Sequence, residues 1–261
     1  MRRRRPAPPA LVAVAVVGMA FVALPLAGLL ARAPWGRAAE LVASGAVLTA
    51  LRLSLVVSSA AAVLALVLGL PIAWLLARAD FPGRAVVRAL VLLPVVLPPV
   101  VGGVGLLAAL GRRGLVGAAL EGMGIRLAFT TAGAVLAATF VSLPLVVLAA
   151  EAGLRALDPR LEDAAATLGA SPWYTLRRVT LPLLRPQVGA GLVLAWARAL
   201  GEFGATITFA GNLRGRTQTL PLAVYELLQT DPDGAIAVSL VLVGLSVGVL
   251  VALRGRWLAL G

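Results

Sequence analysis

The 261-residue sequence contains no cysteine, no histidine and no lysine. A Walker A loop, G-x-x-x-x-G-K-[ST], needs its lysine, so we do not expect this chain to hydrolyse ATP by the P-loop route. Without histidine and cysteine it cannot build a Ser-His-Asp or Cys-His nucleophile, nor a metal site of imidazole or thiolate ligands. The sequence therefore predicts a chain that is not an enzyme, binds no cofactor or metal itself, and takes its energy from another subunit or from an ion gradient.

Charged residues are also scarce. They make up 13% of the chain, whereas soluble domains average about 25%, and hydrophobic residues make up 61%. The net charge of +12 does not indicate nucleic-acid binding, because all 23 basic residues are arginines and most of them stand at the ends of apolar runs. This distribution is typical of an integral membrane protein whose arginines flank its spans.

Six apolar runs are long enough to cross a bilayer as helices, for which about 20 residues are needed. We therefore predict an all-α, polytopic membrane protein with a single transmembrane domain over residues 1–261, since no linker or internal repeat is visible. The first run allows a second interpretation, a cleaved signal peptide, although it exceeds the usual length of about 7–15 apolar residues. The predicted spans are residues 10–31, 53–77, 85–110, 127–150, 188–210 and 235–253.

Arginine counts predict the orientation of these spans. An N-terminus in the cytoplasm places 14 of the 23 arginines on the inner side and 7 on the outer side, with Arg52 and Arg198 at or within spans. Arg2–Arg5, before the first span, form a dense basic group. Since cytoplasmic loops carry the excess of arginine, we expect a multi-pass protein of the inner membrane with both termini in the cytoplasm.

The third span carries many helix-breaking residues in the segment LPVVLPPVVGGVG, residues 93–105. Pro94, Pro98 and Pro99 each remove a backbone donor, so this helix must kink or break. Backbone carbonyls that are freed within lipid need protein or water as partners. Two interpretations remain open here: a bent wall beside a transport pathway, and close helix packing through the glycines.

The segment between the fourth and fifth spans, residues 151–186, forms a loop on the predicted cytoplasmic side. Its capping residues predict two short helices, because side-chain caps and Pro begin helices and Gly ends them. The predicted order is Asp158 and Pro159 at the start of the first helix, Gly169 at its end, Ser171 and Pro172 at the start of the second, and Leu181-Pro182 after its end at about Thr180.

This loop has two interpretations. The alanines from Ala164 onward offer a low-profile surface that another protein can approach closely, and Trp173 and Tyr174 beside Arg177 are typical of an anchor at an interface. Alternatively, the two helices lie on the membrane surface with their arginines on lipid phosphates.

The spacing of the loop resembles the EAA loop of ABC-importer permease subunits, written E-A-A-x3-G-x9-I-x-L-P. Here Asp163-Ala164-Ala165 is followed by three residues, Gly169, nine residues and Val179-x-Leu181-Pro182. Asp163 stands where the family has glutamate, with Glu162 directly before it, and Val179 stands for isoleucine. The resemblance implies that the loop docks on a cytoplasmic P-loop ATPase subunit, which binds the ATP and Mg²⁺. The residues that we assign to this coupling are Asp163, Ala164, Ala165, Gly169, Trp173, Arg177, Leu181 and Pro182.

The fifth span contains two opposite charges four residues apart, Arg198 and Glu202. Two charges at the bilayer centre cost roughly 5–7 kcal/mol, whereas the eight Leu, Ile, Val and Phe residues of this span return only about 2.4–4.8 kcal/mol. The pair must therefore face protein or water. On a continuous helix Thr206 shares this face. Arg198, Glu202 and Thr206 are thus candidates for the translocation path or its gate, and the alternative is a buried ion pair that fixes helix packing.

Residues 197–226, ARALGEFGATITFAGNLRGRTQTLPLAVYE, resemble the corresponding region of molybdate ABC transporter permeases. Sulfate and thiosulfate permeases share the ARALGEFG part and resemble the rest less well. The resemblance implies an ATP-driven importer for a tetrahedral oxyanion, with molybdate favoured and sulfate, thiosulfate or tungstate as alternatives. It also implies a homodimer in the lipid membrane, two ATPase subunits, and an external binding protein that delivers the anion.

Two arginines of the predicted outer loop, Arg214 and Arg216, are candidates for docking that binding protein or for attracting the anion. For each arginine taken alone, an ordinary solvated loop charge is the favoured interpretation. Two functions of other classes also remain open: a carrier driven by an ion gradient, and a membrane scaffold without transport.

Overall fold

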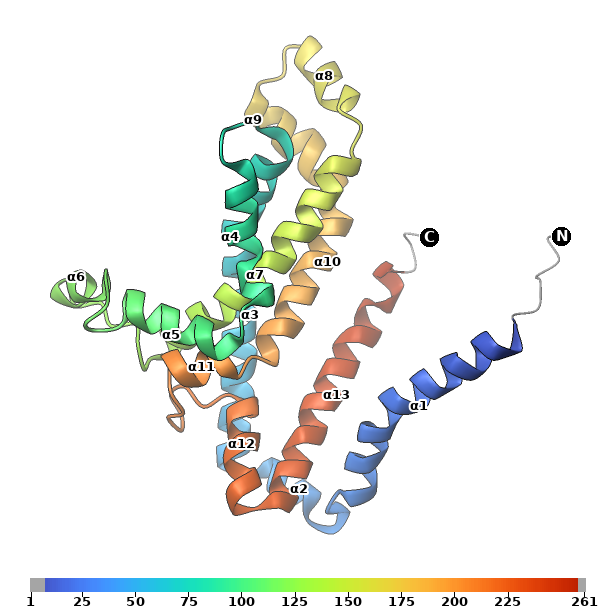
Figure 1. The fold of residues 1–261 in the computed structure, drawn as a ribbon, viewed down its shortest axis with the longest axis vertical. Coiled ribbons are helices and arrows are strands. Elements are labelled where there is room, and N and C mark those ends of the chain that lie inside the picture. Colours follow the sequence, from blue (N-terminus) through green and yellow to red (C-terminus); the bar gives the residue numbers. More distant parts are fainter. Residues whose placement is uncertain (1–7, 258–261) are drawn as a thin grey trace.

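The computed structural model describes residues 8–257, which form helices joined by short connections and contain no strand (Figure 1). Five helices are long and apolar enough to cross a membrane, and a sixth span results if one bent pair of helices counts as a single crossing. The predicted all-α, polytopic fold is therefore confirmed. Arg2–Arg5 lie outside the described residues.

The long apolar segments correspond to the six predicted spans. They are α1 (Pro9–Arg32), α3 (Gly45–Arg78), the bent pair α4 (Arg84–Val96) and α5 (Pro99–Leu110), α7 (Thr131–Ala156), α10 (Leu181–Leu200) and α13 (Pro232–Trp257). Shorter elements connect them: α2 (Trp35–Ala43), α6 (Gly117–Gly122), α8 (Arg160–Thr167), α9 (Pro172–Thr175), the π-helical turn η1 (Leu176–Thr180), α11 (Gly204–Phe209) and α12 (Leu220–Thr230).

The centre of the bundle is formed by α3, α7 and α10, which pack closely because small residues line their contacts. A Cβ atom built on Gly191 of α10 would lie 2.8 Å from the Cβ atom of Ala149 on α7. One built on Gly153 of α7 would lie 2.9 Å from the side chain of Leu184 on α10. Within a membrane, such contacts supply the van der Waals attraction that holds helices together.

The helix α3 extends well beyond the predicted second span. It begins at Gly45 rather than Leu53, after Ser44, whose hydroxyl accepts a hydrogen bond from the N–H of Val47 at 3.5 Å. Its 34 residues give a length of about 51 Å, whereas the hydrocarbon core is about 30 Å thick. The charge of Arg52 does not interrupt this helix because its side chain is exposed.

The third span breaks between α4 and α5, as its prolines predict. The two helices meet at an angle of 119°. Leu97 and Pro98 are both extended, with ψ angles of 132° and 129°, and Pro99 starts α5 at the position where a missing N–H costs nothing. In Figure 1 α5 runs across the bundle rather than along it.

The fifth span breaks as well, which was not predicted. The helix α10 ends at Leu200 and α11 starts at Gly204, so residues 188–210 do not form one continuous helix. Gly201 is a poor helix former, and the carboxylate of Glu202 accepts a hydrogen bond from the backbone N–H of Ala205 at 2.8 Å, which favours a new helix start.

Several of the short connecting elements lie at opposite ends of the bundle. Figure 1 shows α8 and α9 at one end, and α2 and the turn between α12 and α13 at the other. The Pro9 end of α1 and the Trp257 end of α13 both point toward the side of α8. No residue of α1 is buried within the chain, so its apolar surface is available to lipid or to another protein.

Candidate functional site

The helix α8 has the capping pattern that the sequence predicts, shifted by one residue at its start. It begins at Arg160 rather than Pro159, and the carboxylate of Asp158 accepts a hydrogen bond from the N–H of Arg160 at 3.0 Å. Gly169 follows its end with a φ angle of +83°. The N–H groups of Gly169 and Ala170 bond back to the carbonyls of Ala166 (2.9 Å) and Ala165 (3.0 Å), which is a Schellman cap.

The second helix of the loop starts as predicted but does not end where predicted. The hydroxyl of Ser171 accepts a hydrogen bond from the N–H of Tyr174 at 3.3 Å, and Pro172 is the first helical residue. The chain then stays helical through η1 into α10, so Leu181-Pro182 is not an end. The N–H of Leu181 bonds to the carbonyl of Leu176, and this wider turn directly before Pro182 relieves the crowding that a proline causes in an α-helix.

The loop is shorter than the predicted residues 151–186, because α7 continues to Ala156 and the next helix begins at Pro172. We call residues 157–175 the coupling loop. Three large apolar or aromatic side chains of this loop are exposed: the exposed fractions of Leu168, Trp173 and Tyr174 are 88%, 65% and 56%. The guanidinium carbon of Arg177 lies 5.9 Å from the centre of the Trp173 ring, within range of a cation–π interaction.

The two acidic residues of α8 face different ways. Glu162 points toward the bundle, where its Oε2 atom lies 3.2 Å from Nε of Arg78 and its Oε1 atom accepts a hydrogen bond from the hydroxyl of Thr180 at 2.7 Å. Asp163, which aligns with the glutamate of the EAA pattern, is exposed. The sequence showed Glu162 only as the neighbour of Asp163, and nothing in the sequence pairs it with Arg78.

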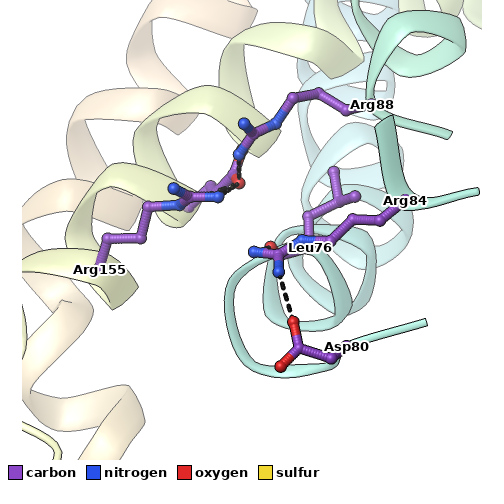
Figure 2. A network of polar contacts seen from close by, with 6 residues as sticks. Leu76, Asp80, Arg84, Arg88 and Arg155 are labelled. Carbon is purple, nitrogen blue, oxygen red and sulfur yellow. Dashed lines mark hydrogen bonds and ion pairs between the residues drawn. The ribbon is translucent and has the colours of Figure 1, made fainter. Parts of the chain in front are cut away.

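A second carboxylate ties helices together at the same end of the bundle (Figure 2). Glu151 of α7 is 5% exposed and pairs with both Arg88 of α4 and Arg155 of α7. Nearby, Arg84 donates to the carboxylate of Asp80 at 2.9 Å and to the carbonyl of Leu76 at 2.5 Å. Arginines that sequence reasoning assigned to membrane flanks thus also hold α3, α4 and α7 in place.

The predicted pair in the fifth span is formed. Nη1 of Arg198 lies 2.6 Å from Oε2 of Glu202, and the other carboxylate oxygen caps α11. The side chain of Glu202 is 1% exposed and that of Arg198 is 35% exposed. Thr206 is buried too, but it lies on α11, so the predicted single face of one helix is wrong. The pair instead bridges the break between α10 and α11.

The two breaks pack against each other. A Cβ atom built on Gly204, at the start of α11, would lie 2.9 Å from Cβ of Pro99 at the start of α5. One built on Gly103 would lie 2.7 Å from Cβ of Thr208 and 2.9 Å from the carbonyl oxygen of Ala205. The third span is therefore both bent and tightly packed through its glycines. The predicted place of this bend beside a transport pathway stays a prediction.

The loop before α12 is organised by Glu226. Its carboxylate pairs with Arg214 and accepts hydrogen bonds from Gln218 at 2.5 Å and Asn212 at 3.5 Å. The Arg214 hydrogen bond lowers the pKa of Glu226 below its ordinary value, against the opposing effect of burial. Arg214 and Arg216 are both exposed, and Arg214 pairs with Glu226 within the chain.

The two broken spans and the exposed helical loop at one end define the class of protein, an ABC-importer permease. A bacterial ABC transporter involved in the import of the acidic polysaccharide alginate has the same fold, with a TM-score of 0.77 over 95% of this chain and 93% of that chain at 19% identity. A structure of a bacterial alginate ABC transporter in complex with an alginate pentasaccharide-bound periplasmic protein matches with a TM-score of 0.75 over 95% and 91% of the two chains.

The chain belongs to the binding-protein-dependent transport system inner membrane component family, whose sequence profile matches residues 65–259. It is 50% identical to the molybdenum transport system permease protein ModB of Mycobacterium tuberculosis, over 93% of this chain and 92% of that protein. ModB of Escherichia coli K12 is 47% identical over 80% and 92% of the two chains. The sulfate transport system permease protein CysT of Escherichia coli K12 is 37% identical over 85% and 82%. The chain is therefore a membrane transport subunit rather than an enzyme, as predicted.

Proposed function

We propose that this chain is the membrane-spanning subunit of an ATP-driven importer for molybdate. The observation that carries the proposal is the coupling loop, which has EAA spacing and exposes Leu168, Trp173 and Tyr174 on a chain that lacks the lysine of a P-loop. The substrate follows from the relatives, since those named for molybdenum transport reach 50% identity and the sulfate permease reaches 37%. Tungstate, sulfate and thiosulfate share the tetrahedral shape and are the alternatives.

The assembly is a homodimer of this chain with two cytoplasmic P-loop ATPase subunits, which hold the ATP and Mg²⁺, and an external binding protein. Both termini lie in the cytoplasm, on the side of the coupling loop. Aromatic residues with an arginine beside them, as at Trp173, Tyr174 and Arg177, are typical anchors of such an interface. ATP binding closes the ATPase dimer, and the coupling residues, Asp163 to Pro182, carry this movement into the spans as a rigid-body change between outward-open and inward-open states.

The proposal is tested by expressing the chain with its candidate ATPase and external binding protein. Wild-type chain should retain the ATPase in a pull-down and take up labelled molybdate, and Gly169→Pro, which disrupts the loop, should lose both. Unlabelled tungstate, sulfate and thiosulfate, added as competitors, establish which anion the importer takes. Uptake that persists without the ATPase and stops when an ionophore collapses the ion gradient would replace the importer with a secondary carrier. A complete lack of anion uptake would favour a scaffold.

Within this importer, we assign the translocation path to the break in the fifth span. About a third of the Arg198 side chain is exposed, and Glu202 binds the guanidinium through Nη1. The exposed part of the guanidinium is therefore available to an anion. Thr206 lies one turn into α11 and adds a hydroxyl near the same break. The contact of α5 with α11 makes both breaks part of one wall.

We expect Arg198→Gln and Glu202→Gln to reduce molybdate uptake about tenfold or more. Arg198→Gln leaves the buried charge of Glu202 alone, and Glu202→Gln removes the carboxylate that holds the guanidinium of Arg198. Arg185→Gln is the matched control, since Arg185 is an exposed arginine on the same helix. Uptake is compared at equal amounts of protein in the membrane. Wild-type uptake by both variants would remove the pair from the path.

A further inference from the structure

The contacts of Glu162 single it out within the coupling loop. Its carboxylate receives Arg78, the last residue of α3, and Thr180, the last residue of η1 before α10. The side chains of Arg78 and Glu162 are only 19% and 25% exposed, and Thr180 is 1% exposed. One carboxylate therefore joins α8 both to the distant end of α3 and to η1, which follows α8 closely in the sequence. We call Arg78, Glu162 and Thr180 the Glu162 clasp.

The position of α8 depends on this clasp. The helix has eight residues, and isolated helices of that length are marginal in water. Two short turns, residues 157–159 and residues 168–171, connect it to α7 and to α9. The apolar side chains of Leu161 and Leu168 are 46% and 88% exposed, so they do not anchor it to the bundle. Among the described residues, the ion pair to Arg78 is the only salt bridge that α8 makes.

Through the clasp, a displacement of α8 acts on α3 and α10. Arg78 ends α3, which packs along both α7 and α10 at the centre of the bundle. Thr180 directly precedes α10, whose other end carries Arg198 at the break of the fifth span. The Glu151 cluster, in contrast, joins α4 to α7 and shares no salt bridge with α8 in the described part of the chain.

The guanidinium of Arg78 is incompletely hydrogen-bonded in this conformation. Nε and Nη2 of Arg78 are buried without a hydrogen bond of good geometry to any described residue, although Nε lies 3.2 Å from Glu162. A buried guanidinium favours bidentate contact with a carboxylate. A small movement of α8 can supply that geometry, so the pair is suited to change when the loop is displaced.

Resting on the proposed function, we propose that Glu162 is the positioning residue that transmits the movement of the coupling loop to α3 and α10, while Asp163 faces the ATPase. The EAA spacing assigns the glutamate position to Asp163, and the structure divides the two roles between neighbouring residues. The coupling loop therefore acts on two spans at once through one carboxylate, in addition to the peptide links at its ends.

The test uses the full complex of this chain, its ATPase and its binding protein in proteoliposomes. The variants are Glu162→Gln, Arg78→Gln, the exchanged pair Arg78→Glu with Glu162→Arg, and Asp163→Asn. Arg160→Gln is the matched control, since Arg160 is an exposed residue of the same helix. Three quantities are measured: retention of the ATPase in a pull-down, the ATP hydrolysis rate with loaded binding protein, and the molybdate transported per ATP hydrolysed.

We expect Glu162→Gln and Arg78→Gln to retain the ATPase but to transport about tenfold less molybdate per ATP, and the exchanged pair to recover at least part of this loss. Asp163→Asn should weaken retention of the ATPase, and Arg160→Gln should resemble wild type in all three quantities. A transport ratio within about twofold of wild type in both single variants overturns the proposal, as does a loss of ATPase retention that explains the whole defect. Neither result affects the proposed function, which is tested separately by molybdate uptake of the wild-type complex and by the dependence of that uptake on the ATPase.

Discussion

At the scale of single residues, two glycines make the contact between α5 and α11 possible. Gly103 and Gly204 lie where any Cβ atom would overlap the backbone or side chains of the opposite helix. Packed interiors accommodate an added methyl group only by shifting their neighbours. The wall that we assign to the translocation path is therefore sensitive to a single carbon atom.

We expect Gly103→Ala to lower the stability of the protein by about 1–3 kcal/mol, because its Cβ atom would lie 2.9 Å from the carbonyl oxygen of Ala205. Gly105→Ala, two residues further along α5, is the matched control, since a Cβ atom there meets nothing within 4 Å. Thermal unfolding of the purified protein in detergent, followed by size-exclusion chromatography, measures both. Equal midpoints for the two variants would contradict the contact.

Single residues also mark where sequence reasoning reaches its limit. Arg198 and Glu202 could be paired from the sequence because they are four residues apart, and their charge within an apolar run required a partner. Arg78 and Glu162 are separated by two spans, the bent pair α4 and α5 and then α7, so no local pattern joins them. The EAA spacing led to Asp163, and only the direction of the side chains shows that Glu162 is the one facing the bundle.

At the scale of elements, the short helices of the coupling loop were predicted well because their signals are local. Ser171, Pro172 and Gly169 act within one turn of their own position. The helix that follows was predicted less well, since a π-helical turn lets Pro182 continue it. The break after Leu200 was missed because an ion pair at a spacing of four residues is compatible with both a continuous and a broken helix.

Gly169 provides a test of the coupling loop at this scale. Its φ angle of +83° is accessible to glycine and tolerated by asparagine, but costs about 1–2 kcal/mol for alanine. We expect Gly169→Ala to weaken ATPase binding about 5–30-fold and Gly169→Asn to weaken it less. Titration of the purified chain in detergent with the ATPase measures the affinities.

Gly189→Ala serves as the control for this experiment, because a Cβ atom at that position of α10 meets nothing within 4 Å. Its affinity for the ATPase should equal that of wild type. If Gly169→Ala binds as tightly as Gly189→Ala, the left-handed end of α8 has no part in presenting the loop.

At the scale of the whole molecule, the arrangement of the ends supports the proposed orientation. The ends of α1 and α13 point toward the side of α8, and the turn between α12 and α13 lies at the opposite end (Figure 1). The excess of arginine falls on the side of α8, where Arg84, Arg88 and Arg155 also form ion pairs. The helix ends place the two termini on the side of the coupling loop, and the excess of arginine indicates that this side is the cytoplasm.

The absence of cysteine makes this orientation directly measurable, because an introduced thiol is the only one in the chain. We expect Gln229→Cys, at the exposed end of α12, to react with a membrane-impermeant maleimide added outside intact spheroplasts. Leu168→Cys in the coupling loop, 88% exposed, should react only in inverted vesicles. The reverse pattern would place the coupling loop outside and exclude a cytoplasmic ATPase as its partner.

The crossing of α5 and α11 has a consequence for biogenesis. About 100 residues separate Pro99 from Gly204, and at roughly 5–20 residues per second the ribosome needs about 5–20 s to make them. During that interval the bent third span is already made while its partner is not. Until Gly204 is made, the surface of α5 that α11 covers needs the insertion machinery or a chaperone beside it. A chain that ends before Gly204 keeps this surface uncovered, and cellular quality control can recognise it there.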